Sequence, residues 1–198
     1  MRDADIVETF ERAACRVNIY LDRDCESPRE NDNLAVFAHW HRRLTLGDSR
    51  IQPCDEEELR ERVPGILAIL PLFIYEHGGV TMSTGAYSCQ FDSGQVGWGY
   101  VTEESAKVMG CVGPEWTTKR LEDLIIAEVA TFDDYLTGSC YGYMVLGAEG
   151  DDLDSCWGFI GDLDYVRSQA REAADSADDP AIQRRADELA ARATYAAG

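Results

Sequence analysis

The order of strand-like and helix-like segments limits the folds open to this chain. Short apolar or alternating runs predict strands over residues 16–21, 66–75, 80–87, 95–102, 140–146 and 155–160. The longest periodic pattern predicts a helix over residues 118–136, with apolar side chains at Leu121, Leu124, Ile125, Val129 and Phe132. Because strands and helices do not alternate as βαβ units, we expect an α+β fold: a mostly antiparallel sheet with one long packed helix and a helical C-terminal extension.

Three further segments complete this prediction. Residues 4–14 are predicted to form a short helix, and residues 34–40 fit either a strand or a helix. Asp55 is placed to cap an acidic helix over residues 56–63, since its carboxylate can accept the free amide hydrogens of the first turn.

Composition divides the 198 residues into two parts. Residues 1–161 are mixed and are predicted to form the α+β domain. Residues 162–198 are rich in Ala, Arg and Asp, with one apolar stripe before Pro180 and a second after it. We therefore expect residues 162–198 to form a helical extension of two short helices or one kinked helix.

Charge narrows the classes of partner. The chain carries 18 basic and 37 acidic residues, a formal net charge of −19. Such a surface repels phosphate, so neither nucleic acid nor an anionic membrane is an expected partner, whereas a basic protein is. No apolar run is long enough to span a bilayer, and the seven single cysteines include no CxxC pair, so we expect a cytoplasmic protein with reduced thiols.

The acidic residues are densest near the C-terminus. Residues 149–179 contain ten acidic and two basic side chains. Dense negative charge attracts the basic grooves of proteins that bind DNA. The predicted partner-binding residues are Asp151, Asp152, Asp154, Asp162, Asp164 and Asp175. The alternative interpretation is a solvated face that confers solubility.

A possible catalytic group lies in the segment 75–102, which is rich in small and hydroxyl residues. A nearby imidazole can activate a thiol, so Cys89 and His77 are a candidate pair, with Asp92 or Glu76 to orient the histidine. Local turn structure or partner contact is the favoured interpretation, because Asp92-Ser93-Gly94 is good turn chemistry in itself.

Two patterns could hold metal ions. Asp22, Asp24 and Glu26 place oxygen ligands on alternate residues, as a calcium loop does, but the match to an EF-hand is poor. His39 and His41 would share one face of a strand and could bind a transition metal. For both patterns a structural role is favoured, and no cofactor is expected apart from possible calcium.

Several motifs resemble an uncharacterised family of bacteriophage, prophage and mobile-element proteins. They are E-S-P-R-E-x-D-N over residues 26–33, H-R-R with G-D over residues 41–48, H-x-G-x-T-x-S-T with S-C-x-x-D-S-G-Q-V-G over residues 77–97, and D-S-C-W-G over residues 154–158. The resemblance covers most of residues 16–160 and carries no established activity. It implies a protein that acts in the bacterial host.

The charge and the resemblance together predict a non-enzymatic protein. It would bind and inhibit a basic host protein, such as a nuclease of a CRISPR or restriction defence system. The alternatives are a small cysteine-dependent hydrolase or transferase centred on Cys89 and His77, and a binding module stabilised by calcium at Asp22, Asp24 and Glu26.

Overall fold

The computed structural model describes residues 5–89 and 91–177, which form two compact units. Unit 1 comprises residues 5–25 and 138–177, and unit 2 comprises residues 26–137. Each unit has its own sheet and core, and the expected α+β fold with mostly antiparallel sheets is confirmed. The boundary expected at residues 161 and 162 falls within unit 1. Residues 178–198 lie outside the described residues, so the extension as a whole stays a prediction.

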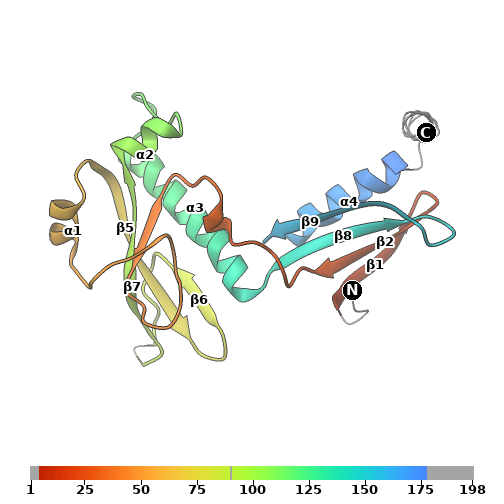
Figure 1. Ribbon diagram of the computed structural model, residues 1–198, viewed down its shortest axis with the longest axis horizontal. Helices are drawn as coiled ribbons and strands as arrows, with labels where there is room; N and C mark the ends of the chain where they lie inside the picture. Colours follow the sequence, from red (N-terminus) through yellow and green to blue (C-terminus); the bar gives the residue numbers. More distant parts are fainter. Residues whose placement is uncertain (1–4, 90, 178–198) are drawn as a thin grey trace, which may run out of the picture. The chain divides into compact units, whose positions relative to one another are not determined.

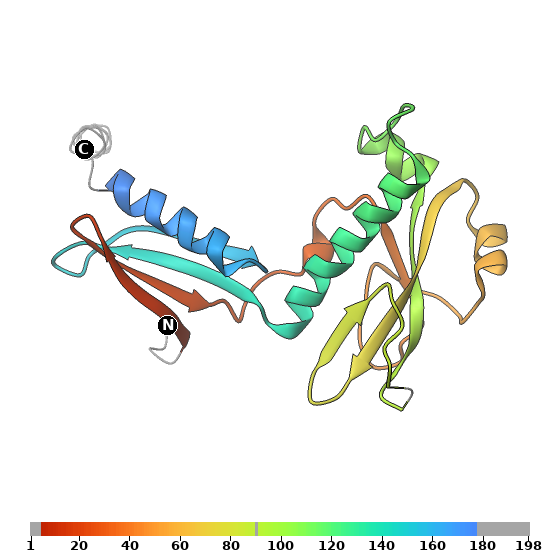
Figure 2. The same cartoon turned by 180° about the vertical axis from the view of Figure 1, so that it is seen from behind.

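Unit 1 is a four-stranded antiparallel sheet with one helix on one face (Figures 1 and 2). The strand order is β1-β2-β8-β9, so hairpins from the two ends of the chain lie side by side. The elements are β1 (Ile6–Arg12), β2 (Cys15–Leu21), β8 (Cys140–Leu146), β9 (Asp152–Ile160) and α4 (Leu163–Ala177). The predicted hairpin around residues 147–150 is confirmed.

The core of unit 1 lies between α4 and the central strands. Val17, Ile19 and Val145 are fully buried beneath Val166 and Ala170 of the helix. The small side chains on α4 let the helix approach the sheet closely, so this part of the expected extension packs firmly against its strands.

The helix predicted over residues 4–14 is wrong. Residues 6–12 form strand β1, which pairs with β2 through a two-residue turn. Ala13 in this turn has a φ of 53°, and alanine is not a residue that signals a left-handed turn. The hairpin forms because Phe10 joins the apolar cluster beneath α4, a tertiary contact that local propensity does not register.

Unit 2 is a five-stranded sheet with a helix on each face (Figures 1 and 2). The strand order is β4-β3-β7-β5-β6, and its neighbours are antiparallel except β3 and β4. The strands are β3 (Val36–His39), β4 (Ser49–Arg50), β5 (Ile66–Glu76), β6 (Val80–Ser83) and β7 (Ser93–Thr102). The helices are η2 (Pro28–Glu30), α1 (Glu56–Arg62), α2 (Glu103–Val108) and α3 (Thr118–Thr137).

Two clusters fill the faces of the unit 2 sheet. On one face, α3 packs Leu121 and Ile125 against Phe37 and Leu72. On the other face, Leu59 of α1 packs with Ile69 and the rest of a smaller cluster. The long helix was therefore correctly predicted, as was the cap of α1, where Asp55 accepts a hydrogen bond from the Glu58 amide at 2.9 Å.

Strand β5 is continuous through Pro71. Strand β6 pairs only with residues 73–76, so Pro71 lies where β5 has β7 as its single neighbour. A proline lacks the N–H needed for two neighbours but is tolerated with one. Next to Pro71, strand β7 has Gly97, which pairs with Leu72 of β5 and with His39 of β3. A Cβ added at Gly97 would overlap the carbonyl oxygen of Ala38, so β3 and β7 can approach this closely only with a glycine here.

An internal ion-pair network joins two of the sequence motifs in unit 2. The Arg29 side chain is 6% exposed, and its guanidinium contacts Asp48 at 2.6 Å and Glu128 at 2.8 Å. Asp48 also accepts a hydrogen bond from the Phe37 amide, and Glu128 accepts one from the Leu34 amide. Charged groups of opposite sign thus tie the E-S-P-R-E loop and the G-D turn to β3 and α3.

Candidate functional site

The structure brings the three candidate catalytic residues into one loop region at the ends of β5 and β7. Asp92 is the common partner: its Oδ2 lies 3.6 Å from Cys89 Sγ and 3.4 Å from His77 Nδ1. Among the described contacts, none joins Cys89 directly to His77. The carboxylate therefore accepts the hydrogen bond of the thiol, whereas a Cys–His nucleophile needs the imidazole in that position.

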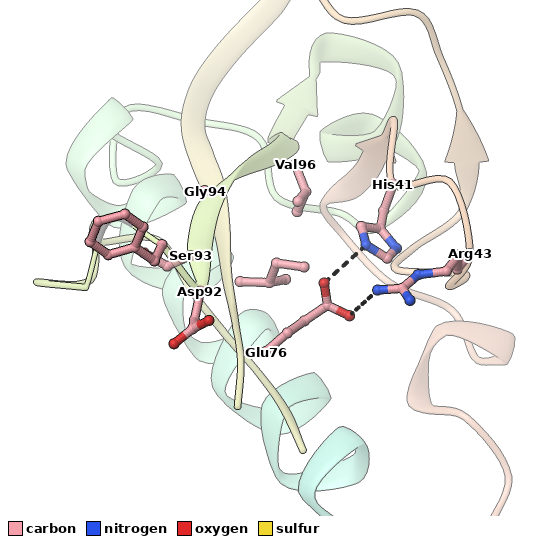
Figure 3. A pocket seen from close by; sticks show the side chains of 9 residues that line it. His41, Arg43, Glu76, Asp92, Ser93, Gly94 and Val96 are labelled. Atoms are coloured by element: carbon pink, nitrogen blue, oxygen red, sulfur yellow. Dashed lines mark hydrogen bonds and ion pairs between the residues drawn. The ribbon is translucent and has the colours of Figure 1, made fainter. Parts of the chain in front are cut away.

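The pocket beside this loop has a volume of about 340 Å³ and is lined mainly by polar groups (Figure 3). Its centre is Glu76, whose carboxylate lies 3.4 Å from His41 Nε2 and 3.3 Å from Arg43 Nη2. The Asp92 side chain points away from this trio in Figure 3. Glu76 therefore faces His41 and Arg43, and it does not orient His77.

Both ring nitrogens of His41 have a partner. The Leu44 amide donates a hydrogen bond to His41 Nδ1 at 3.0 Å, which leaves the proton of the neutral ring on Nε2, facing Glu76. A general base needs a free nitrogen lone pair, and this imidazole has none. The pocket thus lacks a base at His41, and Glu76 holds the loop after β3 in place.

His39 has a similar structural role. It is 2% exposed, and its Nε2 accepts a hydrogen bond from the Leu46 amide at 3.3 Å. Burial lowers the pKa of His39, and the positive charge of Arg50 lowers it further. The neutral ring leaves Nδ1 without a hydrogen-bond partner among the described residues. His39 and His41 hold the same loop through backbone amides, which occupies the lone pairs that a shared metal would need.

The acidic loop after β2 uses its first carboxylate in local structure. Asp22 Oδ1 accepts a hydrogen bond from the Asp24 amide, and Asp22 Oδ2 accepts one from the Gly158 amide at 3.1 Å. Asp24 lies in unit 1, and Glu26 is the first residue of unit 2. Within residues 5–89 and 91–177, no three His, Cys, Asp or Glu side chains are grouped to hold a metal ion.

The six predicted partner-binding carboxylates fall into two groups. Three of them lie on or beside α4 and are engaged: Asp175 pairs with Arg12 at 2.7 Å, Asp164 with Arg167 at 2.5 Å, and Asp162 accepts the Asp164 amide. The other three, Asp151, Asp152 and Asp154, lie on β9 and the turn before it and are exposed. No ion pair in the described part of the chain involves these three.

The arginines described in unit 1 explain why the carboxylates of Asp151, Asp152 and Asp154 have no ion pair. All five in its described residues already have an acidic or aromatic partner: Arg12 with Asp175, Arg16 with Glu11, Arg23 with Asp5, Arg167 with Glu8 and Asp164, and Arg171 with Phe10. The negative charge at the hairpin tip is therefore not compensated by the arginines in the described part of the unit. Such a surface attracts a positively charged partner over several ångströms of solvent.

Sequence reasoning missed the apolar side chains on the same hairpin. Trp157 is 40% exposed and Leu153 is 39% exposed, next to the free carboxylates. The Trp157 ring lies against Gly142, where an added Cβ would overlap the indole, and its centroid is 5.7 Å from that of Tyr20. Aromatic side chains held rigidly at a surface are frequent anchors of protein interfaces. The D-S-C-W-G run was the available signal.

Comparison with models of known protein families, with curated proteins and with solved structures finds no match. None of the helices in the described part of the chain is long and apolar enough to cross a membrane.

Proposed function

We propose that this protein binds a basic host protein and inhibits it without catalysing a reaction. One observation carries the proposal: Asp151, Asp152 and Asp154 project from one hairpin while every arginine described in unit 1 is engaged elsewhere. Uncompensated surface charge speeds encounter with a partner of opposite sign and selects against partners of the same sign. Asp164 and Asp175 pair with arginines and Asp162 accepts a backbone amide, so the three hairpin carboxylates carry the proposal.

The resemblance to phage and mobile-element proteins suggests the class of partner. We propose a nuclease of a host defence system, CRISPR or restriction, acting in the bacterial cytosol. The groove of such an enzyme binds a polyanion, so it is lined by basic side chains. A protein that occupies the groove needs complementary charge and shape and no catalytic group, which fits a pocket whose histidine has no free lone pair.

The test is capture from a bacterial host lysate with three forms of the protein. One is the wild type, and one carries Asp151→Asn, Asp152→Asn and Asp154→Asn. The third is a control with the same change in net charge elsewhere, Glu57→Gln, Glu61→Gln and Glu104→Gln in unit 2. We expect wild type and control to retain one basic protein at low salt and to inhibit its activity, and the hairpin variant to lose both.

Three results would count against the proposal. They are equal capture by all three forms, capture that does not weaken at high salt, and a captured protein that emerges chemically altered. The last would indicate an enzyme.

One observation favours a second candidate function: Asp92 Oδ2 lies 3.6 Å from Cys89 Sγ and 3.4 Å from His77 Nδ1. It is a cysteine-dependent hydrolase or transferase. A thiol-reactive probe at neutral pH should then label Cys89 faster than exposed Cys156, and the Asp92→Asn variant should change that rate. Equal labelling of the two thiols would remove this candidate. Calcium binding at Asp22, Asp24 and Glu26 stays a prediction, tested by a rise in Tm with calcium that Asp24→Ala abolishes.

A further inference from the structure

The two edge strands of the unit 1 sheet differ in how they are protected. Strand β1 is fastened to α4 by the pairs Arg167–Glu8 at 2.7 Å and Arg12–Asp175 at 2.7 Å. Strand β9 makes no ion pair with α4 within the described residues, and its residues from Asp152 to Gly158 are exposed. An edge strand with free backbone N–H and C=O groups is a template for pairing with another extended chain.

The register defines the part of β9 that is regular enough to act as a template. Asp154, Ser155 and Cys156 pair in sequence with Val145, Met144 and Tyr143, and the strand is irregular on either side of this stretch. Residues directly opposite share a face, so Asp154 and Cys156 lie on the face that α4 covers and Ser155 on the open face. Burial raises the pKa of Tyr143, and the neighbouring carboxylate of Asp154 raises it further, in agreement with this placement.

The negative charge on β9 favours one kind of strand as the partner for its free edge. Two copies of this chain joined edge to edge would bring Asp152 and Asp154 close to the same carboxylates of the other copy, which is unfavourable. Arginines at alternate positions of an added segment share one face. On the open face they would lie beside Asp152, which pairs with Leu146, whereas Asp154 lies on the face that α4 covers. On the open face, the Trp157 ring offers a surface on which a guanidinium can stack.

We propose that the free edge of β9 binds an extended, arginine-containing segment of the partner by strand addition. Backbone hydrogen bonds to the regular stretch at residues 154–156 would supply the register, and Asp152 and Trp157, which share the open face, would select arginine. This proposal rests on the proposed function, since it names the part of the basic partner that the hairpin recognises.

The test uses the full chain and three synthetic peptides with blocked ends. The parent peptide is four repeats of Arg-Thr, one analogue is N-methylated on every arginine, and the other is N-methylated on every threonine. Alternate amides of a strand point to opposite edges, so strand addition uses the amides of only one residue type. We expect one analogue to bind like the parent and the other to bind at least about 10-fold more weakly. With the parent peptide, exchange should slow at those amides among residues 154–156 that point away from β8, whereas exchange in β1 should not change.

The outcomes separate this proposal from the one it rests on. Equal binding of all three peptides, weakened by salt and by the Asp151, Asp152 and Asp154 substitutions, would overturn strand addition and leave recognition by charge in place. Equal loss with both analogues, or slower exchange in β1 in place of β9, would also overturn strand addition. Failure of the parent peptide to bind at low salt would overturn strand addition, and capture of a basic protein that depends on the hairpin carboxylates would then still support recognition by charge.

Discussion

The Arg29 network of unit 2 and the β8–β9 hairpin of unit 1 are both rich in carboxylates, and they use them in opposite ways. Both oxygens of Asp48 and both of Glu128 accept hydrogen bonds from Arg29 or from backbone amides. Asp151, Asp152 and Asp154 have no such partners among the described residues. Acidic residues with internal partners hold a fold together, and only those without partners are free to attract another molecule.

The largest effect is expected inside the network. Arg29→Met should lower the free energy of unfolding by about 3–5 kcal/mol, because it leaves Asp48 and Glu128 without their buried cation. Denaturant unfolding measures this. Arg42→Met, at an exposed arginine of the same unit, is the control and should change stability by less than about 0.5 kcal/mol. Equal effects of the two substitutions would remove the contrast between internal and free charge.

The packing beneath Trp157 should give the next largest effect. Gly142→Ala places a methyl group where the indole lies, which should cost about 1–3 kcal/mol and displace the ring. Gly79→Ala, where nothing lies within 4 Å of an added Cβ, is the matched control. Thermal unfolding and the indole N–H resonance of Trp157 would report the two changes. An unshifted resonance would show that the ring does not rest on Gly142.

His39 should make stability depend on pH in the neutral to acidic range. Burial lowers its pKa from the ordinary value of 6.5, so below that pH the unfolded chain binds the proton and the folded chain does not. Stability should therefore fall as the pH drops through 6.5 and continue to fall until the lowered pKa is reached. Unfolding of wild type and of His39→Gln from about pH 7.5 to 5 tests this, with a shallower slope expected for the variant. Parallel slopes would contradict it.

A smaller pH effect is expected where Asp175 pairs with Arg12. The hydrogen bond and charge of Arg12 lower the pKa of Asp175 below its ordinary value of 3.8. The pair therefore stabilises the folded state above that pH, and its contribution disappears as the pH falls through the lowered pKa. Wild type should be slightly more stable than Asp175→Asn at neutral pH, with the difference closing in acid. A difference that persists in strong acid would assign it to packing.

The smallest effect on stability should come from the hairpin itself. Each of Asp151→Asn, Asp152→Asn and Asp154→Asn should shift the free energy of unfolding by no more than about 0.5 kcal/mol, since these side chains have no partner among the described residues. Denaturant unfolding beside the Arg29→Met variant gives the comparison directly. A large loss of stability would mean that the carboxylates are structural, as they are in the network.

Local patterns predicted much of the fold. The apolar stripe of α3 and the cap at Asp55 follow from short-range spacing, and both are present. The β1–β2 hairpin was missed because its turn, Ala13-Ala14, has no turn-forming residue and its strand is fixed by Phe10 packing under α4. The division into two units was also hidden, because unit 1 joins residues that are more than 100 positions apart.

The candidate site was only partly predicted, because it too depends on contacts between residues that are distant in the sequence. Local composition named Asp151, Asp152 and Asp154, but it also named Asp164 and Asp175, whose partners Arg167 and Arg12 cannot be assigned from composition. Arg12 and Asp175 are 163 residues apart in the chain. Which carboxylates stay free is thus a property of tertiary structure, and so is the seating of Trp157 on Gly142.

Binding through the hairpin carboxylates is tested most directly by titrating the purified basic partner with the three forms used for capture. The mass of the partner is measured by mass spectrometry before and after the titration. We expect the hairpin variant to bind at least about 10-fold more weakly than wild type, the unit 2 control to bind within about 2-fold of wild type, and the mass of the partner to stay unchanged. Equal weakening in the two variants would show that net charge alone drives binding, and a changed mass would show that the protein acts on its partner chemically. Either result would contradict the account.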